Sequence, residues 1–137
     1  MIKIYNCLCA EARNIREQVF VEEQGFENEF DELDAQVPHA VLFMEGQAVA
    51  TGRLLPGEQQ GEFVIGRVAV LQEYRGRHLG EQIMLALEEE ARRAGGKKIS
   101  LSAQCRASGF YQTLGYAERG AVYLDEFCPH ILMEKVL

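Results

Sequence analysis

Residues 73–83, EYRGRHLGEQI, place two arginines and two glycines where a strand-like apolar run changes into a helical pattern. A turn that opens a helix presents backbone N–H groups without helical partners, at the positive end of the helix dipole. Glycines let such a backbone approach a ligand closely, and arginines add charge and hydrogen-bond donors. The junction therefore predicts an anion site, usually for phosphate. On the turn alone, a plain strand–helix connection with solvated arginines fits as well.

Two common nucleotide-binding motifs are absent from this junction. A Walker loop requires G-x-x-x-x-G-K-[ST], and no Gly-Lys in the chain is followed by Ser or Thr. A dinucleotide fingerprint requires G-x-G-x-x-G after the first strand, and the glycines here are spaced differently. A phosphate at this junction would therefore be held in another way.

Composition and charge indicate a single soluble globular domain. Of the 137 residues, 47% are hydrophobic and 26% are charged, a balance typical of folded proteins. The formal charge of −7 argues against nucleic-acid and anionic-membrane partners. No apolar run approaches the roughly 20 residues that span a bilayer, and the N-terminus lacks the apolar core of a secretory signal, so we expect a cytoplasmic protein. Cys7, Cys9, Cys105 and Cys128 lack zinc-type spacing, and no metal site is predicted.

Hydrophobic periodicity predicts the elements that must position the junction. Strand-like runs occupy 2–8, 39–45, 47–55, 62–71, 97–104, 118–126 and 130–136, and helical patterns occupy 10–20, 106–116 and the segment from Leu79 to the glycines at 95–96. The acidic loop 21–36 contains a helical turn near its end. The three short-linked strands between 39 and 71 predict an antiparallel meander, and the strand at 97–104 follows a helix, which predicts parallel pairing. The chain therefore reads as one mixed α/β domain over 1–137.

Two motifs give the sequence a family resemblance. RVAVLQEYRGRHLGEQIM, 67–84, resembles the acetyl-CoA signature of the GNAT N-acetyltransferases, a strand followed by R-x-x-G-x-G/A, and AQCRASGFYQTLGY, 103–116, resembles their second motif. The order of elements also matches that superfamily, so the resemblance covers the chain and implies a mostly antiparallel central sheet of about seven strands flanked by helices. VFVEEQGF, FDELD, RVAVL and HILMEK look like a small bacterial branch often called YjcF-like.

The resemblance implies acetyl-CoA as co-substrate and residues to hold it. Backbone groups of Val68, Ala69 and Val70 would meet the pantetheine arm, and the pyrophosphate would be wrapped by Arg75, Gly76, Arg77, His78, Leu79 and Gly80. Tyr111 occupies the position whose hydroxyl usually protonates the departing CoA thiolate. His78 stands where the signature has glycine, which predicts weaker cofactor binding or a reshaped loop. Gln104 replaces the common asparagine of the second motif.

The motifs do not identify the general base that removes the amine proton. Candidates are Glu23, Asp34, His39 and His130, acting directly or through water. Glu23 ranks first, because the resemblance puts the first helix and its following loop at the acceptor site. An isolated histidine that opens a strand is more often structural.

Charge gives conflicting signals about the acceptor. Seven of the thirteen residues 22–34 are acidic, and at the acceptor site they would favour a cationic amine such as a polyamine, an aminoglycoside or a lysine-like group. A solvated acidic loop explains the same residues. Arg53 and Arg67 lie on predicted strands. They could pair with Asp31, Glu32 or Asp34, or one could bind an anionic group such as a sugar phosphate.

The leading hypothesis is an acetyl-CoA-dependent N-acetyltransferase that acts on a small primary amine, with Tyr111 as general acid. The alternative is a catalytically idle CoA-binding module that serves regulation, which His78 in the loop would favour. Tyr111 favours the enzyme. A homodimer through the terminal strands is compatible with the sequence, and the identity of the amine is not readable from it.

Overall fold

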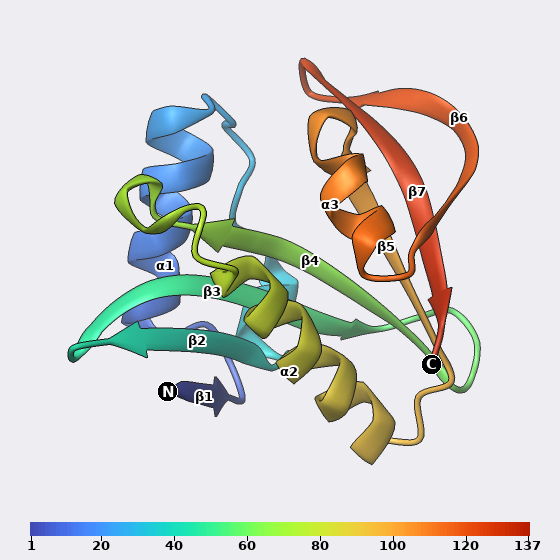
Figure 1. The fold of residues 1–137 in the computed structure, drawn as a ribbon, viewed down its shortest axis with the longest axis horizontal. Helices are drawn as coiled ribbons and strands as arrows, with labels where there is room; N and C mark the ends of the chain where they lie inside the picture. Colours follow the sequence, from blue (N-terminus) through green and yellow to red (C-terminus); the bar gives the residue numbers. More distant parts are fainter.

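A computed structural model describes all 137 residues and confirms the predicted order of elements (Figure 1). The strands are β1 (Ile2–Tyr5), β2 (His39–Met44), β3 (Gln47–Pro56), β4 (Glu62–Val70), β5 (Lys98–Gln104), β6 (Ala117–Asp125) and β7 (Cys128–Val136), and the helices are α1 (Ala10–Arg16), α2 (Leu79–Arg93) and α3 (Ser108–Thr113). A 3-10 turn at Glu32–Ala35 matches the helical turn expected in the acidic loop. No helix is both long and apolar enough to cross a membrane.

Two helical segments differ from their predicted bounds. The first helix changes at Glu17 into a wider π-helical turn that continues to Glu23, so it extends beyond the predicted end at residue 20. The helix predicted over 106–116 is confined to α3, because Cys105–Ala107 forms a separate 3-10 turn and Gly115 takes a left-handed conformation with φ of +98°. Both changes lie next to the cleft described below.

The seven strands form one sheet in the order β1-β2-β3-β4-β5-β7-β6. Only β4 and β5 pair in parallel, and every other neighbouring pair is antiparallel. The crossover through α2 explains the parallel pair, because a helix returns the chain to the starting edge of the sheet. The mixed, mostly antiparallel sheet predicted from the sequence is thus confirmed.

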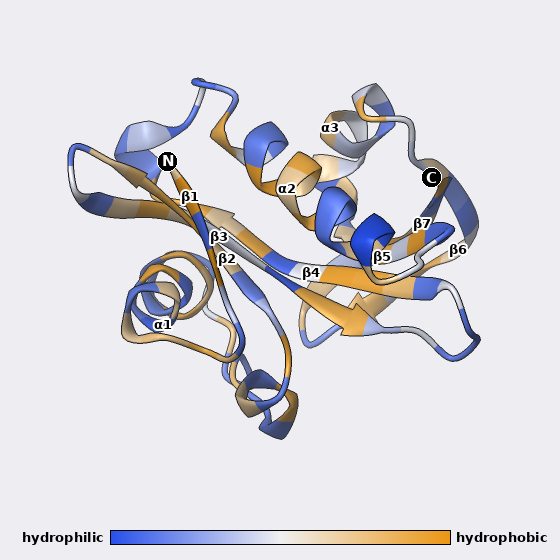
Figure 2. Cartoon of the chain, turned by 90° about the horizontal axis from the view of Figure 1, so that it is seen from below, coloured by the Kyte–Doolittle hydropathy of each residue, from blue (hydrophilic) through white to orange (hydrophobic).

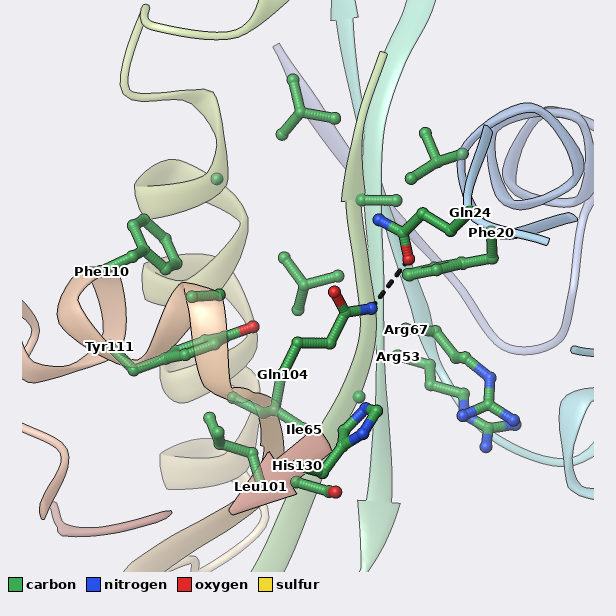
Figure 3. A pocket seen from close by; sticks show the side chains of 18 of the residues that line it. Phe20, Gln24, Arg53, Ile65, Arg67, Leu101, Gln104, Phe110, Tyr111 and His130 are labelled. Atoms are coloured by element: carbon green, nitrogen blue, oxygen red, sulfur yellow. Dashed lines mark hydrogen bonds between the residues drawn. The ribbon is translucent and has the colours of Figure 1, made fainter. Parts of the chain in front are cut away.

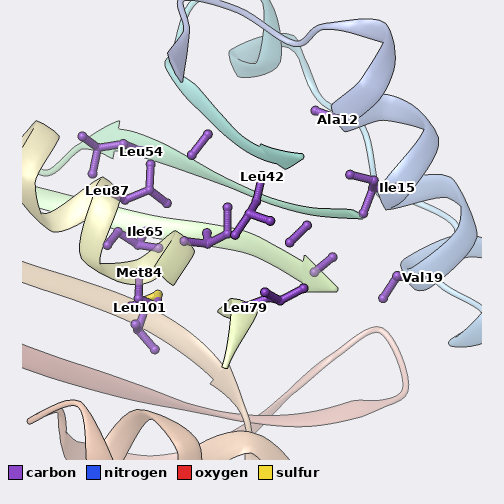
Figure 4. Packing of buried hydrophobic residues seen from close by; sticks show 14 of the residues in the cluster. Ala12, Ile15, Val19, Leu42, Leu54, Ile65, Leu79, Met84, Leu87 and Leu101 are labelled. Atoms are coloured by element: carbon purple, nitrogen blue, oxygen red, sulfur yellow. The ribbon is translucent and has the colours of Figure 1, made fainter. Parts of the chain in front are cut away.

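Helices cover both faces of the sheet, with α1 on one side and α2 on the other (Figure 2). Ile15 and Val19 face the sheet from α1 and the turn after it, while Met84 and Leu87 face it from α2, and all four are buried (Figure 4). A Cβ built on Gly52 of β3 would lie 2.9 Å from side-chain atoms of Ile83 and Leu87, so glycine lets α2 approach the sheet closely.

The parallel pair separates soon after it forms. Only Glu62, Phe63 and Val64 of β4 have partners on β5, and the two strands then diverge (Figure 1). The remaining β5-facing edge of β4 is therefore left without a neighbouring strand. This separation opens the sheet in its middle, and the cleft that results is the candidate functional site.

Candidate active site

A cleft of about 670 Å³ lies where β4 and β5 separate (Figure 3). Its residues come from the π-helical turn, the β4 edge, the loop after β4, the end of β5, α3 and β7, and include Phe20, Gln24, Arg53, Arg67, Val68, Ala69, Val70, Arg75, Gly76, His78, Leu79, Gly80, Gln104, Tyr111 and His130. The structure therefore brings most of the predicted site residues together around one cavity.

The β4 edge of the cleft contains a bulge. Thr51 pairs with Ala69 and Arg53 pairs with Gly66, so β4 has one residue more than β3 between these two pairs. Arg67 takes the extra position with φ of +53°, an uncommon conformation for a residue other than glycine. The bulge bends β4 away from β5 just before Val68, which presents the open edge from Val68 to Val70 to the cleft.

The loop from Arg75 to Gly80 has the geometry expected of an anion site. No backbone N–H from Gly76 to Glu81 donates to a backbone carbonyl, because these groups lie at or before the first turn of α2. Gly76 and His78 both have left-handed conformations, with φ of +81° and +61°. His78 thus adopts a backbone conformation that favours glycine, which accounts for the glycine of the family signature at this position.

Gly80 packs closely against a neighbouring side chain in this region. A Cβ at this position would lie 3.2 Å from the ring of Phe110, whose α3 helix forms the opposite side of the cleft. Glycine therefore brings the start of α2 against α3. The sequence pattern predicts a glycine here because the backbone approaches a phosphate closely. The structure adds a second reason, the close packing of Gly80 against Phe110.

Glu23 lies outside the lining of the main cleft and is held by Arg75. Both terminal nitrogens of Arg75 donate to the Glu23 carboxylate at 2.7 Å, and its Nε donates to the Val70 carbonyl at 3.0 Å. Hydrogen bonding from Arg75 lowers the pKa of Glu23. A carboxylate held in a two-bond ion pair is a weaker proton acceptor, so this arrangement does not favour the leading candidate for the base.

Tyr111 extends from α3 with its hydroxyl pointing into the cleft (Figure 3). Burial raises the pKa of Tyr111 to about 12, because the charged phenolate is poorly solvated there. The hydroxyl therefore stays protonated at neutral pH. A protonated donor facing the cavity is the state that a general acid needs.

His130, on β7, offers a free ring nitrogen to the cleft. Its Nδ1 lies 2.9 Å from the Cys128 carbonyl oxygen, and since a carbonyl only accepts, Nδ1 carries the hydrogen. In the neutral ring the lone pair then resides on Nε2. Phe26 and Tyr123 contact the ring from two sides, with centroids at 6.3 and 6.1 Å, and fix its orientation.

The other two candidate bases are in a different environment. His39, the first residue of β2, is fully buried, and burial lowers its pKa. For Asp34, burial opposes ionisation, but hydrogen bonds from Arg16 and the Asp31 backbone, together with the charges of Arg16 and Arg53, hold the carboxyl pKa well below its usual range. Neither residue lines the cleft. Of the four candidates, His130 alone does so.

Gln104 crosses the cleft to the π-helical turn (Figure 3). Its side-chain nitrogen donates to Gln24 Oε1 at 2.8 Å, and its oxygen accepts from Arg106 Nε at 2.9 Å. The amide that replaces the family's asparagine is therefore engaged within the protein in this structure. Gln24 was not among the predicted site residues, since only the fold brings it to β5.

Three of the seven acidic residues of the segment 22–34 are paired in an ionic network. Its members are Arg16, Glu29, Asp31, Asp34, His39, Arg53 and Arg67. The predicted pairing of Arg53 with Asp31 and Asp34 is confirmed at 2.8 and 2.9 Å. Arg67 also contacts Asp31, at 3.7 Å, and lies closer to Glu29, at 3.2 Å, a pairing that the sequence did not indicate; Glu32 takes no part.

Two features of the cleft are typical of acetyltransferases of the GNAT type: a parallel strand pair that separates, and beside it a loop rich in glycine and arginine that leads into a helix. The family model for the Acetyltransferase (GNAT) domain matches residues 10–137, and the chain belongs to this family. It is 36% identical over 130 residues to the uncharacterized protein YyaT of Bacillus subtilis, covering 91% of this chain and 86% of that protein.

Solved structures agree with this assignment. An acyl-CoA N-acyltransferase from Pseudomonas aeruginosa matches with a TM-score of 0.86 at 30% identity, over 98% of each chain. Escherichia coli ElaA matches with a TM-score of 0.84 at 29% identity, over 98% of this chain and 99% of that one. The predicted family and enzyme class are thus confirmed, while the YjcF-like likeness and the roles of individual site residues stay predictions.

Proposed function

We propose that the protein transfers the acetyl group of acetyl-CoA to a primary amine of a small acceptor by direct attack. The observation that carries this proposal is one continuous cleft that joins three features: the open β4 edge, the free N–H groups before α2 and the Tyr111 hydroxyl. The Tyr111 hydroxyl in this cleft supports an enzyme over a catalytically idle CoA-binding module.

The chain offers two sets of groups that fit acetyl-CoA. The backbone of Val68, Ala69 and Val70 would pair with the pantetheine amides in the manner of an added strand. The N–H groups of the loop would bind the pyrophosphate, together with the side chains of Arg75 and Arg77. For this, Arg75 would shift from its ion pair with Glu23 or bind phosphate through its remaining edge.

Three groups in the cleft would then divide the chemistry. The Val70 N–H would stabilise negative charge that develops on the thioester oxygen. Tyr111 would donate its proton to the departing thiolate sulfur. His130 Nε2 would accept the proton that the amine loses, because its lone pair is free while the Nδ1–H is bound to the Cys128 carbonyl.

Binding of acetyl-CoA provides the first test. Titration calorimetry should show at least micromolar affinity, and a concentration of 100 times the Kd should stabilise the fold by about 2.7 kcal/mol through mass action. Thiol release with a panel of primary amines then tests transfer. Absence of both heat and a melting-temperature shift at millimolar acetyl-CoA would contradict the proposal.

Replacing His130 with glutamine should lower kcat by about 10²-fold, since a general base contributes roughly 10²–10⁴-fold and water can partly replace it. Calorimetry should show unchanged acetyl-CoA binding, which separates a loss of proton transfer from a loss of cofactor. An unchanged kcat with chemistry rate-limiting would assign proton removal to another group.

A further inference from the structure

Two arginines lie side by side on one wall of the cleft, at the end away from the predicted phosphate loop (Figure 3). Arg53 extends from β3 and Arg67 from the β4 bulge, and both contact Asp31, at 2.8 Å for Arg53 and 3.7 Å for Arg67. In the proposed reaction the phosphate loop and the open β4 edge take the cofactor, so the two arginines lie in the part of the cleft left for the acceptor. Their free hydrogen-bonding capacity therefore bears on which acceptor fits.

Hydrogen-bond donors remain unused on both guanidinium groups. Arg53 is only 5% exposed, and its Nε is buried without any hydrogen-bond partner. Arg67 uses its Nε for the Glu29 carbonyl at 3.1 Å, but its Nη1 makes no hydrogen bond and its Nη2 is too far from Asp31 to make one. A buried donor without a partner is costly, so a missing ligand or water is the expected explanation.

The carboxylates of the network, in contrast, are almost fully used. Both oxygens of Asp31 accept from Arg53, and both oxygens of Asp34 accept from Arg16. Glu29 Oε2 is shared between Arg16 and Arg67, and Oε1 is the one oxygen of the three carboxylates without a hydrogen bond. The atoms that the network leaves open are therefore mainly donors, which suits an anion better than a cation.

The backbone of Arg67 supports a binding role for its side chain. A non-glycine residue at φ of +53° is strained, and such strain persists where the surrounding structure holds a residue in a required position. At the bulge, the half-buried Arg67 side chain lines the cavity. Without the extra residue of the bulge, the side chains of β4 beyond this point would face the opposite side of the sheet.

We infer that Arg67, supported by Arg53, binds an anionic oxygen group carried by the amine acceptor, either a carboxylate or a phosphate. This inference rests on the proposed function, because it names the acceptor class for that reaction. An acceptor held by its anionic group at Arg67 presents its amine to the opposite wall, where His130 extends from β7. Of the acidic segment only Glu29 lines the cleft, and it is paired with Arg16 and Arg67, so the segment gives little reason to expect a purely cationic polyamine or aminoglycoside.

Matched amine pairs test the inference directly. Each amino acid is compared with the amine left after removal of its carboxylate, and O-phosphoethanolamine is compared with ethanolamine, using kcat/KM and the thermal shift in the presence of CoA. The anionic member of at least one type of pair should be favoured by about 10–100-fold, the range expected for a charge-assisted contact. Preference within the first type identifies a carboxylate, and within the second a phosphate.

Arg67→Gln should remove this preference, while Arg67→Lys should retain part of it through charge alone. Acetyl-CoA affinity should be unchanged in both, which also shows that the variants are folded. Arg92→Gln, on the exposed side of α2 and outside the cleft, is the control and should keep the full preference.

Two results would overturn the inference while leaving acetyl transfer in place: equal or better use of the uncharged or cationic amines, or an anion preference that survives Arg67→Gln. If no pair shows a preference in either rate or thermal shift, the inference is also wrong. Failure of acetyl-CoA itself to bind would instead contradict the proposed function, and calorimetry detects that separately.

Discussion

Tyr111→Phe is expected to lower kcat by about 10²–10⁴-fold, the usual contribution of a general acid. The change keeps the ring and its packing and removes only the hydroxyl that points into the cleft. Without it, CoA must leave as an unprotected thiolate or take a proton from water. Because the hydroxyl would act on the leaving group in the transition state, acetyl-CoA affinity should barely change.

Steady-state kinetics with an accepted amine, together with calorimetry, measure both effects. Tyr116→Phe is the matched control: its ring contacts Tyr111 edge-on at 6.1 Å, but its hydroxyl donates to buried Glu88 at 2.7 Å and does not face the cleft. That variant should lose stability and keep kcat. If Tyr111→Phe raised only KM, the hydroxyl would position substrate, and an unchanged kcat with chemistry rate-limiting would exclude Tyr111 from proton transfer.

Local patterns were sufficient to predict most of the fold. Period-two and period-3.6 apolar spacing located every strand and helix, and the helix between 62–71 and 97–104 predicted the parallel pair that the structure confirms. Helix ends were less accurate. The extension of the first helix to Glu23 as a π-helical turn follows from its packing on the sheet, which no short window of sequence records.

The site was predictable only where it lies within one motif. The residues from Val68 to Gly80 are close in sequence, so the motif located them together. The general base could not be predicted in this way, because the surroundings of a side chain decide whether it can accept a proton. Glu23 is held by Arg75, 52 positions away in the sequence, and His130 reaches the cleft from the last strand. Gln24 and Glu29 were missed for the same reason. The dense acidic segment was the available signal, but it could not show which oxygens are neutralised.

The second large effect is expected from a substitution in the ionic network that holds the acidic segment, and it concerns stability. Arg16 is fully buried and donates to Glu29 at 2.8 Å and to Asp34 at 2.7 Å, which fixes the acidic segment to the base of α1. Without Arg16, Glu29 keeps only Arg67 as an arginine partner. Asp34 keeps only Arg53, so two buried carboxylates lose much of their compensating charge. Arg16→Met should therefore reduce the free energy of unfolding at pH 7 by about 3–5 kcal/mol, measured by urea denaturation.

Arg13→Met provides a matched control for this substitution. Arg13 and Arg16 both lie over the Phe30 ring, at 4.6 and 4.8 Å from its centroid, but Arg13 is exposed and makes no ion pair. Its loss should change stability by less than about 1 kcal/mol, since an exposed cation–π contact contributes roughly 0.5–1 kcal/mol. A similar loss in both variants would attribute the effect to ring stacking and not to the buried charges.

The pH dependence of the Arg16→Met variant separates charge from lost packing. In the native protein, burial opposes ionisation of Asp34, but hydrogen bonds from Arg16 and the Asp31 backbone, together with the charges of Arg16 and Arg53, outweigh it and hold the carboxyl pKa below its unfolded value of about 3.9. Asp34 therefore stabilises the native protein above that pH, and this contribution is lost as the pH falls through the folded pKa. Without Arg16 the carboxyl pKa should rise, so acid protonates Asp34 and removes a buried charge that Arg53 alone then balances. The difference between native and variant protein should consequently narrow from pH 7 to pH 4, whereas a constant difference would mean that Arg16 stabilises the fold through its packing alone.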